Sequence, residues 1–441
     1  MQSAPEPSPR TKNLVDIKSK PLAEKSLLND KWETIADHLR SAVEKRPATR
    51  TNLSIYKYRI KPNQSKRKLY ANLFEAQRLI RNDVIRFIAE CLANNPIDAI
   101  GALPKVYMLK KLFAADDSAY VTGNPTLVSL AYDFRADTVY TCHRDYLSAL
   151  TKQKRDGKPF DLEADTKLLE SKYGLSFRIP SKYWYSDDWW SSLLPANRRC
   201  LDGRSNNKLP ERIEHTATLK KHPDNKYYIH VPTDITEIKE SRHALIVIDP
   251  GYRTGFTGIN FTTNMLEEIG AGLSTEIAIK DHSLRKLEAK IPNAINHRQR
   301  YHMKKAHALA LSKISNTVDN FYKSVAKHLC TNYSTMVIPR LEPKASNSHN
   351  QSMSNTMSHS KFVDILITKS QQYSNCKVIV ADEHLTSRIC SRCGAYNSTL
   401  GKSKVFNCPR CPVILDRDVN AVYNILMKTL HESGFSFETK A

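Results

Sequence analysis

Apolar and polar positions follow two different periods along the chain, and each period predicts a different kind of element. Residues 51–64, TNLSIYKYRIKPNQ, alternate large apolar side chains with Lys and Arg, which predicts a short strand ended by Pro62. From Lys66 the apolar residues recur every three or four positions, and this predicts a helix with basic residues around its apolar face. Further helical segments continue to a basic break at residues 151–159.

A second group of strands is predicted further along the chain. Residues 212–231, RIEHTATLKKHPDNKYYIHV, read as two strands around a Pro-Asp-Asn turn. This hairpin would supply the neighbours that the strand at 51–64 lacks, so we expect a small β-barrel with the helical region inserted between its segments. Before it, residues 183–190, YWYSDDWW, gather three of the four tryptophans. These rings could stack on unpaired bases or fill a domain core.

The pattern changes at Ala244, where ALIVID is a continuous apolar run typical of a strand buried on both faces. The glycines in the following PGYRTGFTGINF fit a hairpin turn into a second strand. A long helical period around residues 311–329 and further apolar strands at 335–339 and 377–381 complete an alternation of strands and helices. We therefore expect an α/β layered domain. Residues 1–51 have no sustained apolar period and are predicted to be a flexible tail or a weakly docked arm.

Length and charge narrow the class of protein. A chain of 441 residues with 40% hydrophobic content can form two or three domains, and its formal net charge of +22 points to a polyanionic partner, nucleic acid by default. We expect neither a membrane nor a secreted location, because no signal peptide or membrane-spanning apolar run is visible. Arg59, Arg78 and Arg81 are candidate phosphate contacts, although a basic helix face is equally typical of plain solvation.

The cysteines predict one metal site. Cys390, Cys393, Cys408 and Cys411 form two CxxC pairs, a spacing that lets four thiolates close tetrahedrally around Zn²⁺. Four protein ligands leave no open position on the ion, so this zinc would be structural. The other five of the nine cysteines are scattered, as expected of buried thiols rather than of a disulfide framework.

Acidic residues stand at the ends of predicted buried elements. Asp249 ends the ALIVID strand, Glu383 follows the VIVA strand, and Asp416 and Asp418 open a helix. A turn or a helix cap explains a single Asp at such a position. Carboxylates gathered from distant segments onto one sheet are instead typical of a site for two Mg²⁺ ions, which prefer oxygen ligands.

Three motifs in order carry a resemblance. The segments LIVIDPGYRTGFTGI, LTSRICSRCG followed by CPRC, and DRDVNAVYNIL resemble the RuvC-like nuclease of the TnpB superfamily, the relatives of type V CRISPR effectors. The YKYRIKPNQ start and the helical RLIRND resemble the same family's entry into its wedge and recognition domains. The resemblance covers roughly Asn52 to Leu430 and is densest in the last two hundred residues.

This resemblance implies a split acidic triad that binds two Mg²⁺. By position, Asp249 is the first acid and Asp418 the last, with Asp416 as a substitute. The second strand departs from the family, because it ends Pro339-Arg340-Leu341 where Glu-Asp-Leu is usual, and proline cannot bind a metal. The candidates for the second acid are Glu342 and Glu383.

The eukaryotic branch of the superfamily, the Fanzor proteins, favours Glu383. Many of its members carry the glutamate further downstream, before the Thr-Ser that precedes the zinc cysteines, and residues 382–387, DEHLTS, are similar. Asp382 is the neighbouring alternative. The Fanzor resemblance also implies a nuclear location.

The resemblance implies an α+β multidomain chain in which an RNase H-like (RuvC) α/β domain holds an inserted zinc ribbon. It further implies an omega-type guide RNA, one protein per RNA, and double-stranded target DNA. The expected parts are a tail at 1–51, a wedge-type β-barrel at 52–64 and 176–243, a helical recognition domain at 65–175, the nuclease at 244–389 and 412–441, and the ribbon at 390–411.

Two functions follow as hypotheses. The first is an RNA-guided DNA endonuclease associated with a transposon, which cuts by Mg²⁺-dependent phosphodiester hydrolysis next to a short flanking motif. The second is a catalytically inactive relative that still binds RNA and DNA, because the usual glutamate is missing. A transposase that joins DNA ends is a poorer reading, since no tyrosine with neighbouring histidines of the expected kind is evident.

Overall fold

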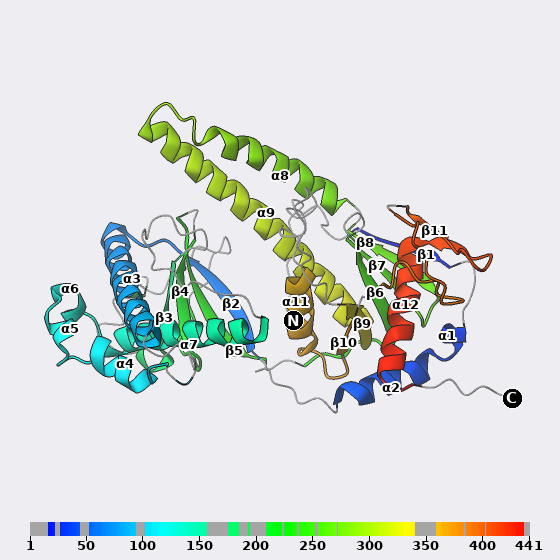
Figure 1. Cartoon of the computed structure of the whole chain (residues 1–441), viewed down its shortest axis with the longest axis horizontal. Helices are drawn as coiled ribbons and strands as arrows, with labels where there is room; N and C mark the ends of the chain where they lie inside the picture. Colours follow the sequence, from blue (N-terminus) through cyan, green and yellow to red (C-terminus); the bar gives the residue numbers. More distant parts are fainter. Residues whose placement is uncertain are drawn as a thin grey trace, which may run out of the picture. The chain divides into compact units, whose positions relative to one another are not determined.

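The apolar run that begins at Ala244 forms β6, an inner strand of a six-stranded sheet ordered β1-β8-β7-β6-β9-β10 (Figure 1). β6, β7 and β8 form an antiparallel meander, whereas β9 runs parallel to β6 and β10 parallel to β9. The strands are β1 (Ile17–Pro21), β6 (Leu245–Gly251), β7 (Gly255–Asn260), β8 (Met265–Ile269), β9 (Thr335–Pro339) and β10 (Lys377–Ala381).

Helices cover both faces of this sheet, which explains why β6 is apolar throughout. Ile246 and Ile248 point to the face covered by α8, α9 and α11. Leu245 and Val247 point to the opposite face, where α2 and α12 pack. The helices of this unit are α1 (Leu27–Asp30), α2 (Trp32–Glu44), α8 (Leu273–Lys290), α9 (His297–Asn332), α11 (His359–Ser370) and α12 (Arg417–Glu432).

The chain divides into two compact units, the first comprising residues 1–53 and 235–441 and the second residues 54–234. The structure, a computed structural model, describes residues 16–22, 27–44, 53–93, 101, 103–156, 175–184, 193–194, 209–222, 225–235, 238–251, 255–270, 272–339, 359–382, 385–401 and 403–435. Within these ranges, no helix has the length and apolar character needed to cross a membrane. The α+β multidomain class expected from the sequence is confirmed.

The N-terminal segment differs from the sequence prediction. β1 pairs antiparallel with β8, and α2 buries Ile35, Ala36 and Leu39 in the core beneath α12. The prediction of a flexible tail is therefore wrong for the described residues between 16 and 44. The sequence did not predict these two elements because β1 is an edge strand with exposed polar side chains and the apolar stripe of α2 is short. Neither segment produces a sustained apolar period.

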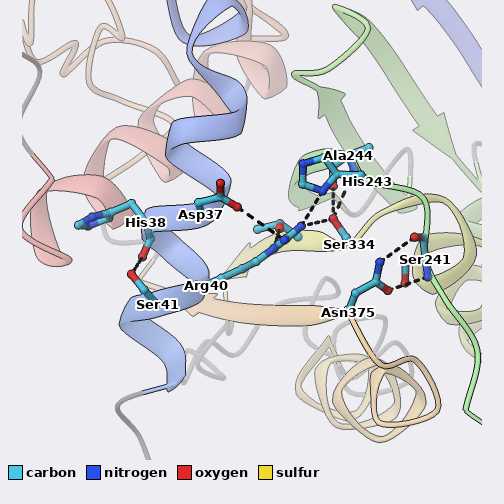
Figure 2. A network of polar contacts seen from close by, with 10 residues as sticks. Asp37, His38, Arg40, Ser41, Ser241, His243, Ala244, Ser334 and Asn375 are labelled. Atoms are coloured by element: carbon cyan, nitrogen blue, oxygen red, sulfur yellow. Dashed lines mark hydrogen bonds and ion pairs between the residues drawn. The ribbon is translucent and has the colours of Figure 1, made fainter.

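Arg40 fastens α2 to the start of β9 (Figure 2). Its Nε donates to Thr335 Oγ1 at 2.8 Å, and its Nη2 donates to the Ser334 hydroxyl and lies 3.1 Å from His243 Nδ1. Asp37 lies 3.6 Å from Nη1. Ser334 and Thr335 are fully buried, so Arg40 supplies a charged donor that water cannot replace.

Replacing Arg40 with methionine is expected to lower the free energy of unfolding of the first unit by about 2–3 kcal/mol, because two buried hydroxyls lose a charged donor. The matched control is Lys280→Met on α8, which removes a half-exposed ion pair with Glu276 at 2.6 Å. That control should change the free energy by less than about 1 kcal/mol. Urea unfolding measures both, and equal losses in the two variants would contradict the role given to Arg40.

His359 makes the stability of the first unit depend on pH. It is buried at the start of α11 against the ring of Phe256, and burial lowers its pKa to about 4. A histidine in the unfolded chain has a pKa near 6.5. Between pH 6.5 and pH 4 the unfolded chain therefore binds more protons than the folded one, so the free energy of unfolding decreases as the pH falls through this range. From pH 7 to pH 5 the loss at this site is expected to be about 2 kcal/mol. Urea unfolding of His359→Leu should show a pH dependence smaller by this amount; an unchanged dependence would contradict the assignment.

The second unit contains a four-stranded sheet ordered β2-β5-β4-β3. Helices α3 and α7 pack on its apolar face through Tyr70, Phe74 and Phe134, which contact Phe177. The elements are β2 (Leu53–Ile60), α3 (Gln64–Ala93), α4 (Val106–Phe113), α5 (Ala119–Thr122), α6 (Pro125–Val128), α7 (Tyr132–Asp156), β3 (Leu175–Ile179), the 3-10 turn η2 (Ser181–Tyr183), β4 (Ala217–Lys221) and β5 (Tyr227–Asp234).

The strand at 53–60 and the hairpin at 217–234 thus share one sheet, as the sequence pattern indicated. Among the described residues β2 and β3 are its edges, so closure into a barrel stays a prediction. Trp184 is buried in the core of this unit and donates to the Pro210 carbonyl, which gives it a packing role. The stretch before β6 belongs to the first unit, since Lys239 pairs with Tyr373. The boundary between the two units therefore lies at residues 234–235, before residue 243, where the sequence pattern placed the end of the barrel.

Candidate functional site

Four cysteines meet in a small ribbon formed by β11 (Val405–Asn407), β12 (Ile414–Asp416) and the loops around them. Cys390 Sγ lies 3.7 Å from Cys411 Sγ, and Cys393 Sγ lies 3.5 Å from Cys408 Sγ. All four sulfurs are within 4.8 Å of one another. A tetrahedral Zn²⁺ with bonds of about 2.3 Å places its sulfur ligands about 3.8 Å apart. The donor set therefore fits a structural zinc ion.

Backbone hydrogen bonds surround the cysteines of the ribbon. The N–H groups of Arg410 and Cys411 each donate to Cys408 Sγ at 3.3 Å. Burial acts to raise the pKa of Cys408, but these donors outweigh it and lower the pKa to about 6. In the first knuckle, Gly394 donates to the Cys390 carbonyl with φ +71°, a conformation that favours glycine. The second knuckle thus favours the thiolate of Cys408, the form that zinc binds, whereas the pKa values of Cys390 and Cys411 are raised, with burial among the causes.

The first candidate acid, Asp249, lies at the carboxyl end of β6. Residues Leu245 and Val247 of β6 pair with Thr335 and Val337 of β9, so the continued register places Asp249 level with Pro339. Pro339 in turn pairs with Ala381 of β10. The three parallel strands therefore end at one edge of the sheet. Since strand side chains alternate, Asp249 shares the face of Val247, which is the face covered by α12.

The helix α12 packs on this face of the sheet (Figure 1), and the last candidate acid, Asp418, stands in its first turn. Asp416 is its N-cap residue, and its Oδ1 accepts the N–H groups of Asp418 at 2.8 Å and Val419 at 3.3 Å. Val419 and Val422 then pack into the core over β6. Asp416 acts as the cap of the helix, and the choice of Asp418 as the metal ligand of the two stays a prediction.

The position of the second acid is not described directly. Glu342 and Glu383 both lie outside the described residues. The neighbouring alternative, Asp382, forms an ion pair with Lys428. Lys428 lies ten residues beyond Asp418, about 15 Å along the axis of α12, so the Asp382 carboxylate is directed away from the first turn. This contact argues against Asp382 and leaves Glu383 and Glu342 as the candidates.

The three arginines proposed to contact phosphate lie in the second unit. Arg59 is exposed on β2, and Arg81 is half-buried on α3. Arg78 Nε donates to Glu75 Oε2 at 3.1 Å, within an ion pair one turn apart on α3. Their role with nucleic acid stays a prediction.

Two clusters were not anticipated from the sequence. Glu214, His215 and Asp234 place their ligand atoms within 4.8 Å of one another, but all three are at least partly exposed and an ion pair between His215 and Asp234 explains the contact. Asn420 and Asn424 of α12 bind the zinc ribbon. The repeat of Asn four residues apart in NAVYN was the available signal.

The chain is similar to several known proteins. Residues 359–425 match the family model described as Cas12f1-like, TNB domain. Over 85% of its length the chain is 22% identical to the putative transposase A625R of Paramecium bursaria Chlorella virus 1, covering 86% of that protein. It is 23% identical to the TnpB-like protein L770 of Acanthamoeba polyphaga mimivirus, again over 85% of this chain and over 73% of the relative. The structure of a Cas12f1-sgRNA-target DNA complex matches with a TM-score of 0.46 and 11% identity, covering 93% of this chain and 98% of that chain.

Proposed function

We propose that this chain, which is similar over 85% of its length to a putative transposase and to a TnpB-like protein, is an RNA-guided DNA endonuclease of a transposon-associated family. The observation that carries the proposal is the acidic edge of the first unit. There Asp249 lies near the end of a buried strand on the face of the sheet that α12 covers, and Asp418 stands in the first turn of α12. The net charge of +22 supports a nucleic-acid substrate.

The candidate ligands suit Mg²⁺ because they are carboxylate oxygens on rigid elements. Asp249, Glu383 and Asp418 would hold two ions. Bound Mg²⁺ supplies an activated water and stabilises the leaving 3′ oxygen during phosphodiester hydrolysis. The chain itself contributes position: pairing in the sheet fixes Asp249, and the Asp416 cap orders the first turn of α12 around Asp418.

The partners follow from the same proposal. An omega-type guide RNA would read the target by base pairing, and one protein would bind each RNA. The second unit would contact the RNA and the short flanking duplex motif, with Arg59, Arg78 and Arg81 on phosphates. No membrane takes part. The nuclear location implied by the Fanzor resemblance belongs to this proposal, and imaging of a fluorescent fusion would test it.

A second candidate function is an inactive protein that binds RNA and DNA. The observation that favours it is Pro339, which stands level with Asp249 in β9, where the family's second acid is expected. If no other acid reaches the site, the chain binds without cutting.

The experiment compares Glu383→Gln with Glu342→Gln in protein purified together with its RNA. Glutamine keeps the size and removes the charge. We expect Glu383→Gln to lower Mg²⁺-dependent cleavage by about 10³-fold, since a metal ligand contributes several kcal/mol, and Glu342→Gln to change it by less than about tenfold. The reverse result would move the second ligand to the loop after β9, and the same loss in both variants would contradict a single relocated acid.

A further inference from the structure

Three polar residues form a stripe along α12. Asn420, Asn424 and Lys428 are spaced four residues apart, so they lie on one face of the helix. Each binds the connection that leads from β10 into the zinc ribbon. Lys428 pairs with Asp382, Asn424 donates to the Thr386 carbonyl at 2.8 Å, and Asn420 reaches the residues around Cys390. The described residues of this connection thus contact α12 at three successive turns of the helix.

Asn420 holds the zinc ligand Cys390 from both sides. Its Oδ1 accepts the N–H of Ser391 at 2.9 Å, and its Nδ2 donates to the Ile389 carbonyl at 2.7 Å. The Asn420 side chain is fully buried. Losing this amide leaves the Ser391 N–H without its acceptor, while the Ile389 carbonyl keeps the Asn424 Nδ2 donor at 2.6 Å.

The ribbon also holds the first turn of α12 from its other side. The Arg417 N–H donates to the Lys404 carbonyl at 2.7 Å, and its Nη1 donates to the Gly401 carbonyl at 3.1 Å. Only Cys390, Leu400 and Phe406 are buried in the ribbon's own core among the residues described there. So small a core depends on its metal for order.

One residue of the connection has an unusual backbone conformation. Leu385 has φ +63°, in the left-handed region that a leucine rarely adopts. A strained residue of this kind persists only when its surroundings determine its conformation. The contacts of Asn424 to Thr386 and Ile389 lie directly after it.

We propose that Asn420 is a positioning residue that couples zinc binding to the first turn of α12, and so to Asp418. Zinc fixes Cys390, the amide of Asn420 carries that fixed geometry across to the helix, and Asp418 stands two residues before Asn420. The role of Asp418 as a ligand rests on the proposed function, whereas the coupling of zinc to the helix does not.

Hydrogen exchange on the full-length protein tests the coupling without any cleavage assay. In the wild type, removal of zinc by a chelator is expected to lower the protection of residues 418–424 by about tenfold or more, and to leave residues 428–432 within about twofold. In Asn420→Ala with zinc bound, residues 418–424 should already exchange faster, and zinc removal should change them by less than about twofold.

The matched control is Asn397→Ala. Asn397 is a buried asparagine of the ribbon whose side chain donates to the Asn407 carbonyl and accepts the Thr399 N–H, so its side-chain hydrogen bonds stay within the ribbon. It should retain the zinc response of residues 418–424. The coupling is overturned if zinc removal leaves these residues unchanged in the wild type, a result that needs no variant to fold, or if Asn420→Ala responds as the wild type does.

A second readout separates the coupling from the proposed function. In Asn420→Ala with a full zinc content, the Mg²⁺ concentration for half-maximal cleavage should rise by about tenfold, with the rate recovering at saturating Mg²⁺. A variant that merely folds poorly would lose active fraction without shifting this concentration, which would contradict positioning. If hydrogen exchange shows the coupling while the wild type never cuts, the proposed function fails and the coupling stands.

Discussion

Asparagine in place of Asp418 is expected to lower the rate of DNA cleavage by about 10³-fold or more, whereas asparagine in place of Asp416 should change it by less than about tenfold. The two acids stand two residues apart at the start of α12, but Asp416 caps the helix through the N–H groups of Asp418 and Val419. Asparagine caps a helix as well as aspartate does. Under the proposed function, only the change at residue 418 removes a metal ligand. Single-turnover cleavage by the purified RNA complex measures both rates.

The control for the Asp416→Asn and Asp418→Asn variants is their binding of nucleic acid. Both variants should bind guide RNA and matched DNA as the wild type does, because neither change removes a positive charge. A loss of the same size in Asp416→Asn and Asp418→Asn would show that the start of the helix, rather than a ligand, had been damaged. Asp249→Asn should behave as Asp418→Asn does, since it is the acid at the end of β6.

Loss of zinc is expected to unfold the ribbon while the six-stranded sheet stays folded. The described ribbon buries few apolar side chains, and zinc bound by four cysteines contributes on the order of 10 kcal/mol to folding in small metal domains. In Cys393→Ser, trypsin should therefore cut at Arg388, Arg392 or Arg410 at least about 100-fold faster than in the wild type. Timed proteolysis with mass spectrometry measures this rate.

The matched control is Cys91→Ser on α3, which lies outside the ribbon. It should keep one zinc ion per chain and the proteolysis rate of the wild type. Full zinc content in Cys393→Ser, or a ribbon that resists trypsin after chelation, would contradict a structural metal held by these four cysteines.

Periodicity revealed the elements whose side chains enter a core. The run at 245–248 predicted β6, and the spacing of Val419, Val422, Leu426 and Leu430 predicted the inner face of α12. The CxxC pairs predicted the sulfur cluster, because ligand spacing within a knuckle is local in sequence. Each of these signals lies within one short segment.

The features that the sequence did not reveal depend on partners far away in the chain. β1 is polar, and only its pairing with β8, more than two hundred residues later, makes it a strand. In the sequence, Arg40 cannot be told from a surface arginine, because its hydrogen bonds to Ser334 and Thr335 at the start of β9 form only in the folded chain. Asn420 reads as a neutral helix residue, and its contact with the residues around Cys390 requires the folded ribbon. The choice between Glu342 and Glu383 came from resemblance and stays a prediction.

The proposed activity of this chain is RNA-guided cleavage of DNA. The most direct measurement is cleavage of a labelled duplex by the wild-type protein purified with its RNA, in Mg²⁺ and in EDTA, on a target matched to the guide and on a mismatched one. The account predicts Mg²⁺-dependent cleavage of the matched duplex alone, abolished by Asp249→Asn. Binding of the matched duplex without any cleavage in Mg²⁺ would contradict it and would establish the binding-protein function instead.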